Sequence, residues 1–136
     1  HKLETISTAY LLVESGKLTS AHFMSDSFPI PRDKPEIAGA FAMAAEIFGI
    51  KMVYLEAGSG ALECVPKDMV QMVSRSVDMP VVVGGGIRNP EKAHELATAG
   101  ASFIVTGNFF EKNGNSNKLE EFAKAVHFRQ TEGVTV

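Results

Sequence analysis

Three apolar segments recur along the chain at intervals of twenty to thirty residues, and each is followed at once by a glycine-rich loop. They are "KMVYLEA" (51–57), "PVVVGG" (80–85) and "SFIVTG" (102–107). Helical patterns separate them, and the runs "VVV" and "FIV" are typical of parallel strands buried on both faces. This alternation predicts consecutive βα units in one parallel sheet.

The flanking segments extend this alternation. Residues 8–14 are predicted to form a strand, and residues 18–24 a second extended piece paired with it. The segment 28–35 contains three prolines, which predicts an irregular loop. A last helix is expected to start near Asn117. The chain therefore reads as strands and helices with short connections.

The helices carry start and stop signals of their own. Asp33 followed by Glu36 has capping-box spacing, so a helix is expected from about 34 to 48, ending at Gly49. Pro66 opens a second helix, and Asn89-Pro90 is an N-cap with a first-turn proline for a third, which ends at Gly100. The first helix is expected to bury one stripe of apolar residues: Ile37, Phe41, Ala44, Ala45 and Phe48.

The spacing of the strands matches that of a (β/α)₈ barrel, in which about 250 residues make eight units. A chain of 136 residues supplies only about four such units, so it is either half a barrel or a small open α/β sheet. We expect residues 1–136 to form a single domain. The chain begins at His1 and not at Met, which is expected of a fragment or a processed piece.

Composition excludes several classes of protein. A net charge of −3 and a pI near 5.8 argue against a nucleic-acid partner. The one cysteine, Cys64, cannot form an internal disulfide and fits a reducing compartment. No apolar run approaches the roughly 20 residues that span a bilayer, and no signal-peptide pattern is present. We therefore expect a cytoplasmic protein.

The three strand ends carry small polar or glycine-rich loops: "EAGSG" (56–60), "GGGIR" (84–88) and "TGNFF" (106–110). In parallel α/β folds these loops lie at one edge of the sheet, where ligands bind. Glycines allow the backbone N–H groups to approach a ligand closely, and a short helix, "NFFEKN" (108–113), is expected to start at Gly107-Asn108. One such loop alone is an ordinary turn, whereas three together predict a phosphate site.

Glu56 stands at the end of its strand, beside a glycine-rich loop, and is interpreted as facing the ligand; the alternative is a solvated rim residue. Tyr54 shares its strand face and would line the same pocket, unless it is a core tyrosine. Arg88 either reaches the phosphate or forms a surface salt bridge. Arg32, Asp33 and Lys34 either close over a pocket or cap the helix. Cys64 reads as a structural thiol, and the histidines show no metal-ligand spacing.

At this level of detail the chain resembles a known family. The segments "YLEAGSGA" (54–61), "VVGGGIRNPEKA" (82–93), "IVTGNFFE" (104–111) and "PIPRDKPEIA" (29–38) resemble the geranylgeranylglyceryl phosphate synthases of archaea. These are (β/α)₈-barrel prenyltransferases that join geranylgeranyl diphosphate to the C3 hydroxyl of sn-glycerol 1-phosphate in ether-lipid biosynthesis. The resemblance covers nearly the whole chain, which matches the C-terminal half of such a TIM barrel.

The resemblance implies roles for individual residues. Glu56 would be the catalytic residue and would hold the glycerol hydroxyls. The segment Tyr54, Leu55, Glu56, Ala57, Gly58, Ser59 and Gly60 would contact glycerol phosphate. Its phosphate would be bound through backbone N–H groups of Gly85, Gly86, Gly107 and Asn108.

The same resemblance implies partners that this chain does not supply alone. The family's Mg²⁺-binding aspartate, and a lysine near the phosphate, belong to N-terminal strands that no residue here matches, so no metal ligand is assigned in this chain. Catalysis would need that other half. We expect a homo-oligomer that uses a prenyl diphosphate and passes its lipid product to the membrane. The alternatives are another phosphate-binding barrel acting on a sugar phosphate, and a non-catalytic phosphate-binding half-barrel.

Overall fold

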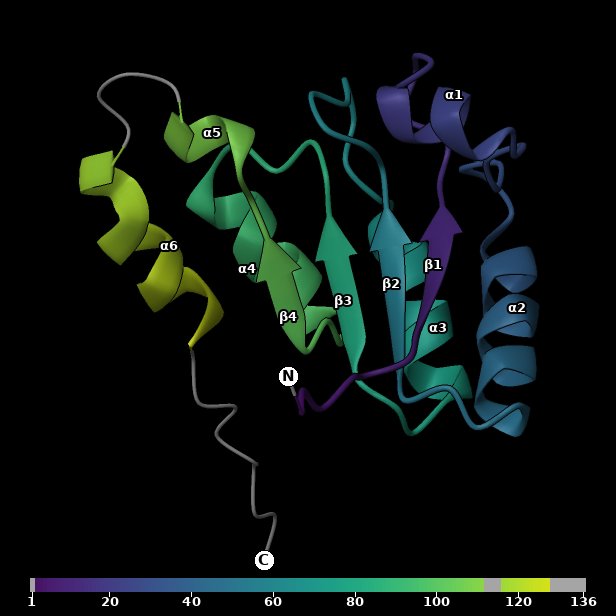
Figure 1. Cartoon of the computed structure of the whole chain (residues 1–136). Helices are drawn as coiled ribbons and strands as arrows, with labels where there is room; N and C mark the ends of the chain where they lie inside the picture. Colours follow the sequence, from purple (N-terminus) through teal and green to yellow (C-terminus); the bar gives the residue numbers. More distant parts are fainter. Residues whose placement is uncertain (1, 112–115, 128–136) are drawn as a thin grey trace, which may run out of the picture.

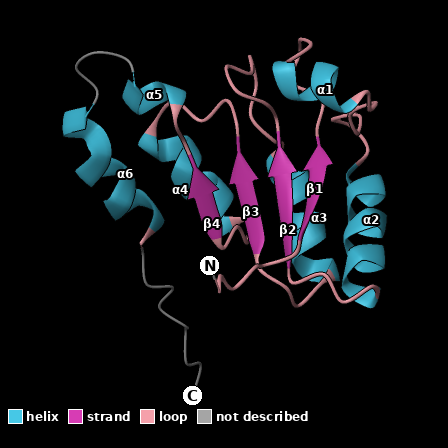
Figure 2. Cartoon of the chain, viewed as in Figure 1, coloured by secondary structure: helices cyan, strands magenta, loops and turns pink. Residues whose placement is uncertain are grey.

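The computed structural model describes residues 2–111 and 116–127. Within these ranges, strands and helices alternate along the chain as the sequence predicts (Figures 1 and 2). The strands are β1 (Thr8–Leu12), β2 (Met52–Glu56), β3 (Val81–Gly84) and β4 (Phe103–Val105). The helices are α1 (Ser20–Ser25), α2 (Pro35–Ile47), α3 (Lys67–Ser76), α4 (Pro90–Thr98), α5 (Asn108–Glu111), the 3₁₀ turn η1 (Ser116–Lys118) and α6 (Leu119–Val126). The predicted short helix after Gly107 is α5, and its expected extension to residues 112 and 113 lies outside the described residues.

The four strands form one parallel sheet in the order β1-β2-β3-β4. Because all four run in the same direction, their carboxyl ends meet at the upper edge in Figure 1, together with the three predicted loops. Helices α3 and α4 lie behind the sheet in this view, and α2 lies beside α3. The parallel α/β arrangement predicted from the sequence is confirmed.

Side chains on the two faces of the sheet have different surroundings. The face toward the helices holds the core, including Val53, Leu55 and Val83, which are fully buried. The other face carries two rows of residues in register across the sheet. One row is Tyr10, Tyr54, Val82 and Phe103; the other is Leu12, Glu56, Gly84 and Val105.

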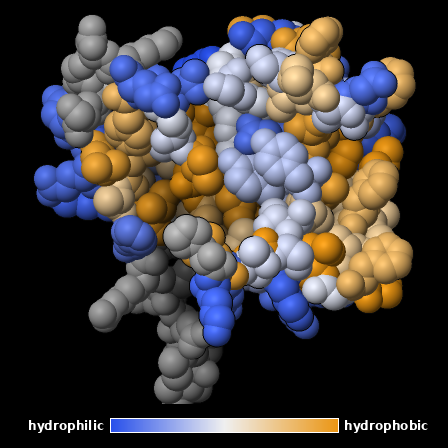
Figure 3. Space-filling view, viewed as in Figure 1, coloured by the Kyte–Doolittle hydropathy of each residue, from blue (hydrophilic) through white to orange (hydrophobic). Residues whose placement is uncertain are grey.

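The second face is partly open, which differs from the expectation that the strands are buried on both sides. The three valines of β3 are buried, but Phe103 and Val105 of β4 are 54% and 44% exposed. Tyr10 of β1 is also 54% exposed, and this open face is the one seen in Figure 3. In a closed barrel the equivalent face is covered by strands on the opposite side. The apolar character of "FIV" therefore fits a strand whose second covering layer is absent from the described residues.

The expected extended segment at residues 18–24 is wrong, because most of it belongs to α1, which begins at Ser20. Thr19 is its N-cap, and the Thr19 N–H donates to Nδ1 of His22 at 3.2 Å. The extended piece that does pair with the end of β1 is Ile30, which forms a parallel bridge with Val13. Thus the proline-containing loop, not the segment before it, covers the free edge of β1 at this point.

The predicted N-terminus of α2 is also wrong by one residue. Lys34, not Asp33, is the N-cap, and it makes no side-chain capping bond. The residue before a proline is disfavoured in helical conformation. Since Pro35 is the first helical residue, Lys34 takes the N-cap position and Asp33 lies one residue before it.

The buried stripe of α2 is made of small residues, not of the large ones that the periodicity indicates. Ala38, Gly39, Ala42 and Ala45 are buried, whereas Phe41 and Phe48 are 55% and 84% exposed. A Cβ added at Gly39 would lie 3.2 Å from Cγ of Met72, so α2 approaches α3 closely. Of the predicted stripe, only Ala45 is buried. Small side chains permit that approach, and the larger ones face away.

Other helix boundaries follow the predictions. Pro66 caps α3, and Asn89 caps α4 by accepting a hydrogen bond from the Lys92 N–H at 2.8 Å. Phe122 of α6 is buried and packs against Phe109 and Phe110 of α5 with ring centroids 5.2 Å and 5.1 Å away. This contact packs α6 against α5, the short helix at the end of the third loop. No helix among the described residues is long and apolar enough to cross a membrane.

Candidate functional site

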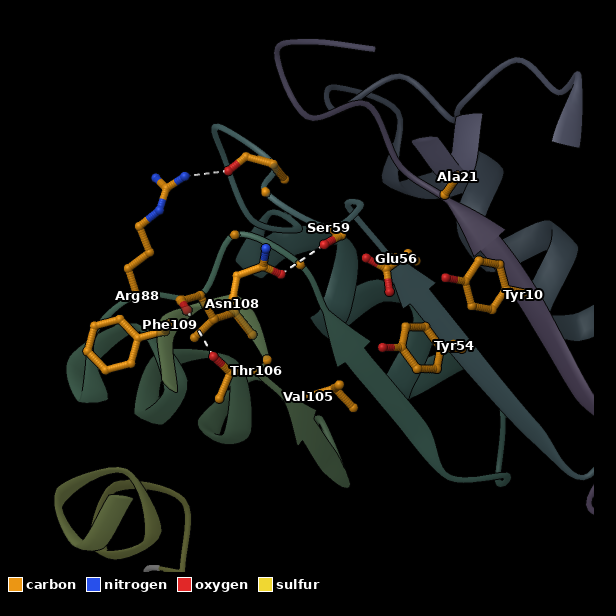
Figure 4. A pocket seen from close by; sticks show the side chains of 16 residues that line it. Tyr10, Ala21, Tyr54, Glu56, Ser59, Arg88, Val105, Thr106, Asn108 and Phe109 are labelled. Atoms are coloured by element: carbon orange, nitrogen blue, oxygen red, sulfur yellow. Dashed lines mark hydrogen bonds between the residues drawn. The ribbon is translucent and has the colours of Figure 1, made fainter. Parts of the chain in front are cut away.

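A cavity of about 410 Å³ opens at the carboxyl ends of β2, β3 and β4, where the three loops meet (Figure 4). Its volume lies within the range typical of small-molecule sites. Eight of the eleven predicted site residues line it: Tyr54, Glu56, Ser59, Gly60, Gly85, Gly86, Gly107 and Asn108. The sequence prediction therefore identifies much of the cavity lining, although the predicted residues come from segments up to more than fifty residues apart.

Among the described residues that line this cavity, Glu56 is the only one with a carboxylate. Its side chain is only 7% exposed, and Oε1 accepts a hydrogen bond from the Gly58 N–H at 2.5 Å. No ion pair to Glu56 occurs in the described part of the chain. A buried carboxylate is costly unless hydrogen-bond donors surround it. The donors around Glu56 therefore decide whether this charge is tolerated.

Two tyrosines face this carboxylate. Tyr10 and Tyr54 are register partners on β1 and β2, and their rings stack with centroids 5.0 Å apart and an interplanar angle of 26°. Figure 4 shows both hydroxyls directed toward the side of the cavity that holds Glu56. Burial and then the negative charge of Glu56 raise the pKa of Tyr10 to about 12, and the same two causes raise the pKa of Tyr54 above its usual value. Both phenols thus remain protonated donors at neutral pH.

Gly84 makes room for this arrangement. It is the register partner of Glu56 on β3, and a Cβ in its place would collide with the hydroxyl of Tyr54 and lie 3.1 Å from Oε2 of Glu56. The first glycine of "GGGIR" therefore admits the tyrosine hydroxyl next to the carboxylate. The sequence prediction names only the second and third glycines as site residues.

At Gly85 and Gly86, the β3–α4 loop lies in close contact with the β2–α3 loop. Gly85 and Gly86 have φ values of +86° and +73°. A Cβ at Gly85 would lie 2.7 Å from Oε1 of Glu56 and 2.7 Å from the Gly58 nitrogen, and one at Gly86 would lie 2.8 Å from the Cys64 nitrogen. Positive φ and close backbone approach both require glycine at these positions. Within the described residues, neither N–H donates to a protein acceptor.

The third loop closes the far side of the cavity. The Ser59 hydroxyl donates to Oδ1 of Asn108 at 2.8 Å, which connects the β2–α3 loop to α5. The Thr106 hydroxyl donates to the Ile87 carbonyl at 3.2 Å and connects the loop to β3–α4. The Gly107 N–H has no protein acceptor among the described residues. Free N–H groups of Gly85, Gly86 and Gly107 thus belong to adjacent loops around one cavity.

The remaining predicted contacts lie elsewhere. Leu55 and Ala57 are fully buried in the core, and Gly58 is buried beneath Thr19, so none of the three lines the cavity. The Ala57 N–H donates to the Gly84 carbonyl, and the Gly58 N–H is held by Glu56. Alternation along β2 accounts for Leu55, because it points to the face opposite Tyr54 and Glu56.

Several lining residues escape prediction from the sequence: Tyr10, Ala21, Ala61, Ile87, Val105, Thr106 and Phe109. Tyr10 is the most consequential of these. Its place depends on the register between β1 and β2, and no local signal in "TAYLLVE" fixes that register. Its chemical type, an aromatic hydroxyl in a strand, was the only available signal.

The weaker sequence candidates also have definite positions. Arg88 lines the cavity and donates to the carbonyls of Ala61 and Leu62, and it forms no salt bridge with a described residue. Arg32 pairs with Glu63 across 2.9 Å. The Cys64 thiol is buried, which raises its pKa, as expected of a structural thiol. No group of three or more His, Cys, Asp or Glu that could hold a metal ion occurs among the described residues.

Comparison with known proteins identifies close relatives. A model of the PcrB family matches residues 1–126. The geranylgeranylglyceryl phosphate synthase of Pyrococcus furiosus is 45% identical over 130 residues, which is 93% of this chain and 51% of that protein. That of Korarchaeum cryptofilum is 51% identical over 110 residues (81% and 45%), and that of Chitinophaga pinensis is 45% identical over 125 residues (92% and 49%). The chain thus spans about half the length of the curated relatives it matches.

Solved structures agree with these relatives. The crystal structure of (S)-3-O-geranylgeranylglyceryl phosphate synthase from Thermoplasma acidophilum, in complex with its substrate sn-glycerol-1-phosphate, superposes with a TM-score of 0.86 at 40% identity. The match covers 92% of this chain and 50% of that one. The enzyme from Thermoplasma volcanium gives 0.84 at 36% identity, with the same coverage of both chains. The predicted partial TIM barrel is confirmed, since the sheet matches about half of these barrels.

We expect the two tyrosines to report the charge of Glu56 directly, because the chain has two tyrosines and no tryptophan. In an alkaline titration followed by tyrosinate absorbance, Tyr10 should be half-ionised near pH 12. Glu56→Gln removes the negative charge and should lower both midpoints, though burial keeps them above the ordinary value of about 10. Unchanged midpoints in the variant would contradict the contact between the phenols and the carboxylate.

The raised pKa values of the two tyrosines also determine how the stability of the fold depends on pH. Both tyrosines have folded-state pKa values above their unfolded values, so above about pH 10 the unfolded chain releases these protons first. The contribution of these groups to stability is therefore fully present below pH 10. It declines as the pH rises toward 12.

A second prediction concerns Gly85. Gly85→Ala places a Cβ against Glu56 and Gly58 in a backbone with positive φ, and should lower the free energy of unfolding by more than the backbone strain alone. Gly49→Ala is the matched control, since Gly49 has φ +79° and nothing within 4 Å of the added Cβ. The control should cost about 1–2 kcal/mol. Denaturant unfolding followed by circular dichroism compares the two, and equal losses would contradict the close approach of the two loops.

Proposed function

The chain belongs to the PcrB family, and on that premise we propose that it carries the glycerol-phosphate site of a prenyltransferase. The reaction joins geranylgeranyl diphosphate to the C3 hydroxyl of sn-glycerol 1-phosphate, giving geranylgeranylglyceryl phosphate and diphosphate. Since the chain spans half of its relatives' length, the activity requires the other half of the barrel. The Chitinophaga pinensis relative is bacterial, so the proposal does not restrict the source to archaea.

One observation carries the proposal most strongly: a buried carboxylate and unpaired backbone donors line the same small cavity. Glu56 is 7% exposed, Oε1 accepts from the Gly58 N–H, and the hydroxyls of Tyr10 and Tyr54 also donate to the carboxylate. An ionised carboxylate has about four lone-pair sites, so Oε2 can accept from a ligand hydroxyl as well. The N–H groups of Gly85, Gly86 and Gly107 have no protein acceptor among the described residues. A glycerol phosphate has the matching chemistry, with hydroxyl donors at one end and an anionic acceptor at the other.

This complementarity gives the ligand an orientation. The phosphate lies against the loops at Gly85, Gly86 and Gly107-Asn108, and the glycerol hydroxyls reach Glu56. Tyr54 and Tyr10 form the wall beneath the carboxylate, on the side of the open sheet face. Leu55, Ala57 and Gly58 belong to the same segment and support the site through the backbone. The predicted role of the segment from Tyr54 to Gly60 is thereby divided between residues that meet the ligand and residues that hold them.

The chemistry requires one bond to form and one to break. The C3 hydroxyl oxygen attacks C1 of the prenyl diphosphate, the bond from C1 to the diphosphate oxygen breaks, and diphosphate leaves. The hydroxyl proton passes to Oε2 of Glu56 late in the transfer. Glu56 also orients the hydroxyl, and positioning a nucleophile within about 3.5 Å of its target contributes much of such a rate enhancement. Exclusion of water, a competing nucleophile, completes the requirement.

The described residues do not fit a magnesium site. Mg²⁺ is usually held by carboxylates together with phosphate oxygens and water. Of the described residues that line the cavity, only Glu56 offers a carboxylate, and one of its oxygens already accepts a hydrogen bond from the Gly58 N–H. We therefore derive no step through a metal and propose that Mg²⁺ ligands at the diphosphate belong to the other half of the barrel.

The family resemblance also suggests where the protein acts and what it exchanges with other components of the cell. We propose a cytoplasmic homo-oligomer that receives a prenyl diphosphate and releases a lipid product to the membrane. Incubation with sn-glycerol 1-phosphate, Mg²⁺ and labelled geranylgeranyl diphosphate tests the reaction. Ether product supports it, and binding of glycerol phosphate without turnover identifies the chain as half of the enzyme. Failure to bind glycerol phosphate would favour a sugar-phosphate enzyme instead.

In an enzyme with both halves of the barrel, Glu56→Gln should lower the turnover number by about 10²–10⁴-fold, because it removes the proton acceptor. The fold should persist, since glutamine keeps an acceptor for the Gly58 N–H. Glu36→Gln, which removes a charge from the exposed first turn of α2, is the control. Steady-state kinetics measure the effect, and wild-type turnover in Glu56→Gln would exclude Glu56 as the catalytic residue.

A further inference from the structure

Two arginines from different parts of the chain donate hydrogen bonds to the same loop of the site. This loop, residues 57–66 between β2 and α3, is called the ligand loop below. Arg88 reaches it from the β3–α4 loop, and Arg32 reaches it from the proline-containing segment before α2. Neither arginine has a part in the chemistry proposed above.

Arg88 binds two consecutive carbonyl groups of the ligand loop. Its Nη2 donates to the Ala61 oxygen at 2.5 Å and its Nη1 donates to the Leu62 oxygen at 3.0 Å. Figure 4 shows the side chain extending from the β3–α4 loop to the ligand loop. The guanidinium fork suits two adjacent acceptors, and hydrogen bonds from a charged donor are stronger than neutral ones. No carboxylate forms an ion pair with Arg88 among the described residues, so its charge is directed at the backbone.

Arg32 holds the other end of the ligand loop. Its Nη1 donates to the Cys64 oxygen at 2.8 Å and to the Glu14 oxygen at 3.0 Å. Its Nη2 lies 2.9 Å from Oε2 of Glu63. Arg32 therefore joins the ligand loop to the end of β1, whereas Arg88 joins it to the end of β3.

The stretch between these anchors is the part that meets the cavity. Ser59 and Gly60 line it, and the loop around them contains two glycines with φ of +99° and +70°, Gly58 and Gly60. Glycine has more conformations to lose than any other residue, so an unanchored loop of this composition samples many arrangements. Only the fraction in the competent arrangement binds ligand, and apparent affinity falls in proportion to that fraction.

We propose that Arg88 and Arg32 are positioning residues that hold the ligand loop in its binding conformation without contacting the ligand. Arg88 is the stronger test, because it also lies beside the cavity and was a candidate phosphate contact. The consequence for glycerol phosphate rests on the proposed function, but the effect on the loop does not.

Two measurements on the same variants distinguish the effect of Arg88 on the loop from its effect on glycerol-phosphate binding. Hydrogen exchange reports the loop through the N–H groups of Gly58, Ala61 and Glu63, which are hydrogen-bonded to Glu56, Gly58 and Ser15. Tyrosine fluorescence reports binding of sn-glycerol 1-phosphate, since both tyrosines line the cavity. The variants are Arg88→Ala and Arg88→Lys. The control is Arg75→Ala, which removes an exposed arginine from the last turn of α3.

Arg88→Ala should speed exchange in the ligand loop but not in α3 or β3, and should weaken glycerol-phosphate binding roughly tenfold. Arg88→Lys keeps the charge but replaces the fork with a single point of contact, so it should recover only part of both effects. Arg75→Ala should change neither.

Unchanged loop exchange in Arg88→Ala would overturn the proposal, whether or not the wild-type chain binds glycerol phosphate. Weaker binding with unchanged exchange would also overturn it, because Arg88 would then contact the ligand directly. A wild-type chain that fails to bind glycerol phosphate, together with faster loop exchange in Arg88→Ala, would contradict the proposed function while supporting the role of Arg88 in the loop.

Discussion

The buried carboxylate of Glu56 constrains the structure around it more than any other group. A charge with so little exposure and no ion pair in the described part of the chain must be surrounded by donors. The Gly58 N–H supplies one, and the two tyrosine hydroxyls face it. The glycines follow from this, because a side chain at position 84 or 85 would occupy the space of the tyrosine hydroxyl or of the carboxylate itself.

The open face of the sheet shows which surroundings of Glu56 belong to this half of the barrel and which do not. Tyr10, Phe103 and Val105 stand on that face in register with Tyr54 and Gly84, and they are half-exposed here. In the barrels that match this chain, further strands complete the enclosure. The cavity that we propose binds glycerol phosphate lies at the ends of the strands and is bounded by loops that this chain supplies. The site we propose is thus local to the chain, whereas the reaction depends on both halves.

Prediction from the sequence succeeds where the signal is local. Strand ends followed by glycine-rich loops locate the cavity, and Asn89-Pro90 and Pro66 locate the starts of two helices. It fails where tertiary contacts decide. The stripe of α2 is misassigned because close packing against Met72 requires small residues, and Tyr10 is missed because register joins β1 to β2. The arginines are left with two interpretations each, since a sequence does not reveal which carbonyl groups lie within reach of a long side chain.

The central claim is that Glu56 recognises the glycerol end of the ligand and the glycine loops recognise the phosphate end. Titration calorimetry of the wild-type chain and of Glu56→Gln, with sn-glycerol 1-phosphate and separately with inorganic phosphate, tests it most directly. The account predicts that the variant loses affinity for glycerol phosphate but binds inorganic phosphate as the wild type does. An equal change in affinity for both ligands, or no change for either, would contradict it.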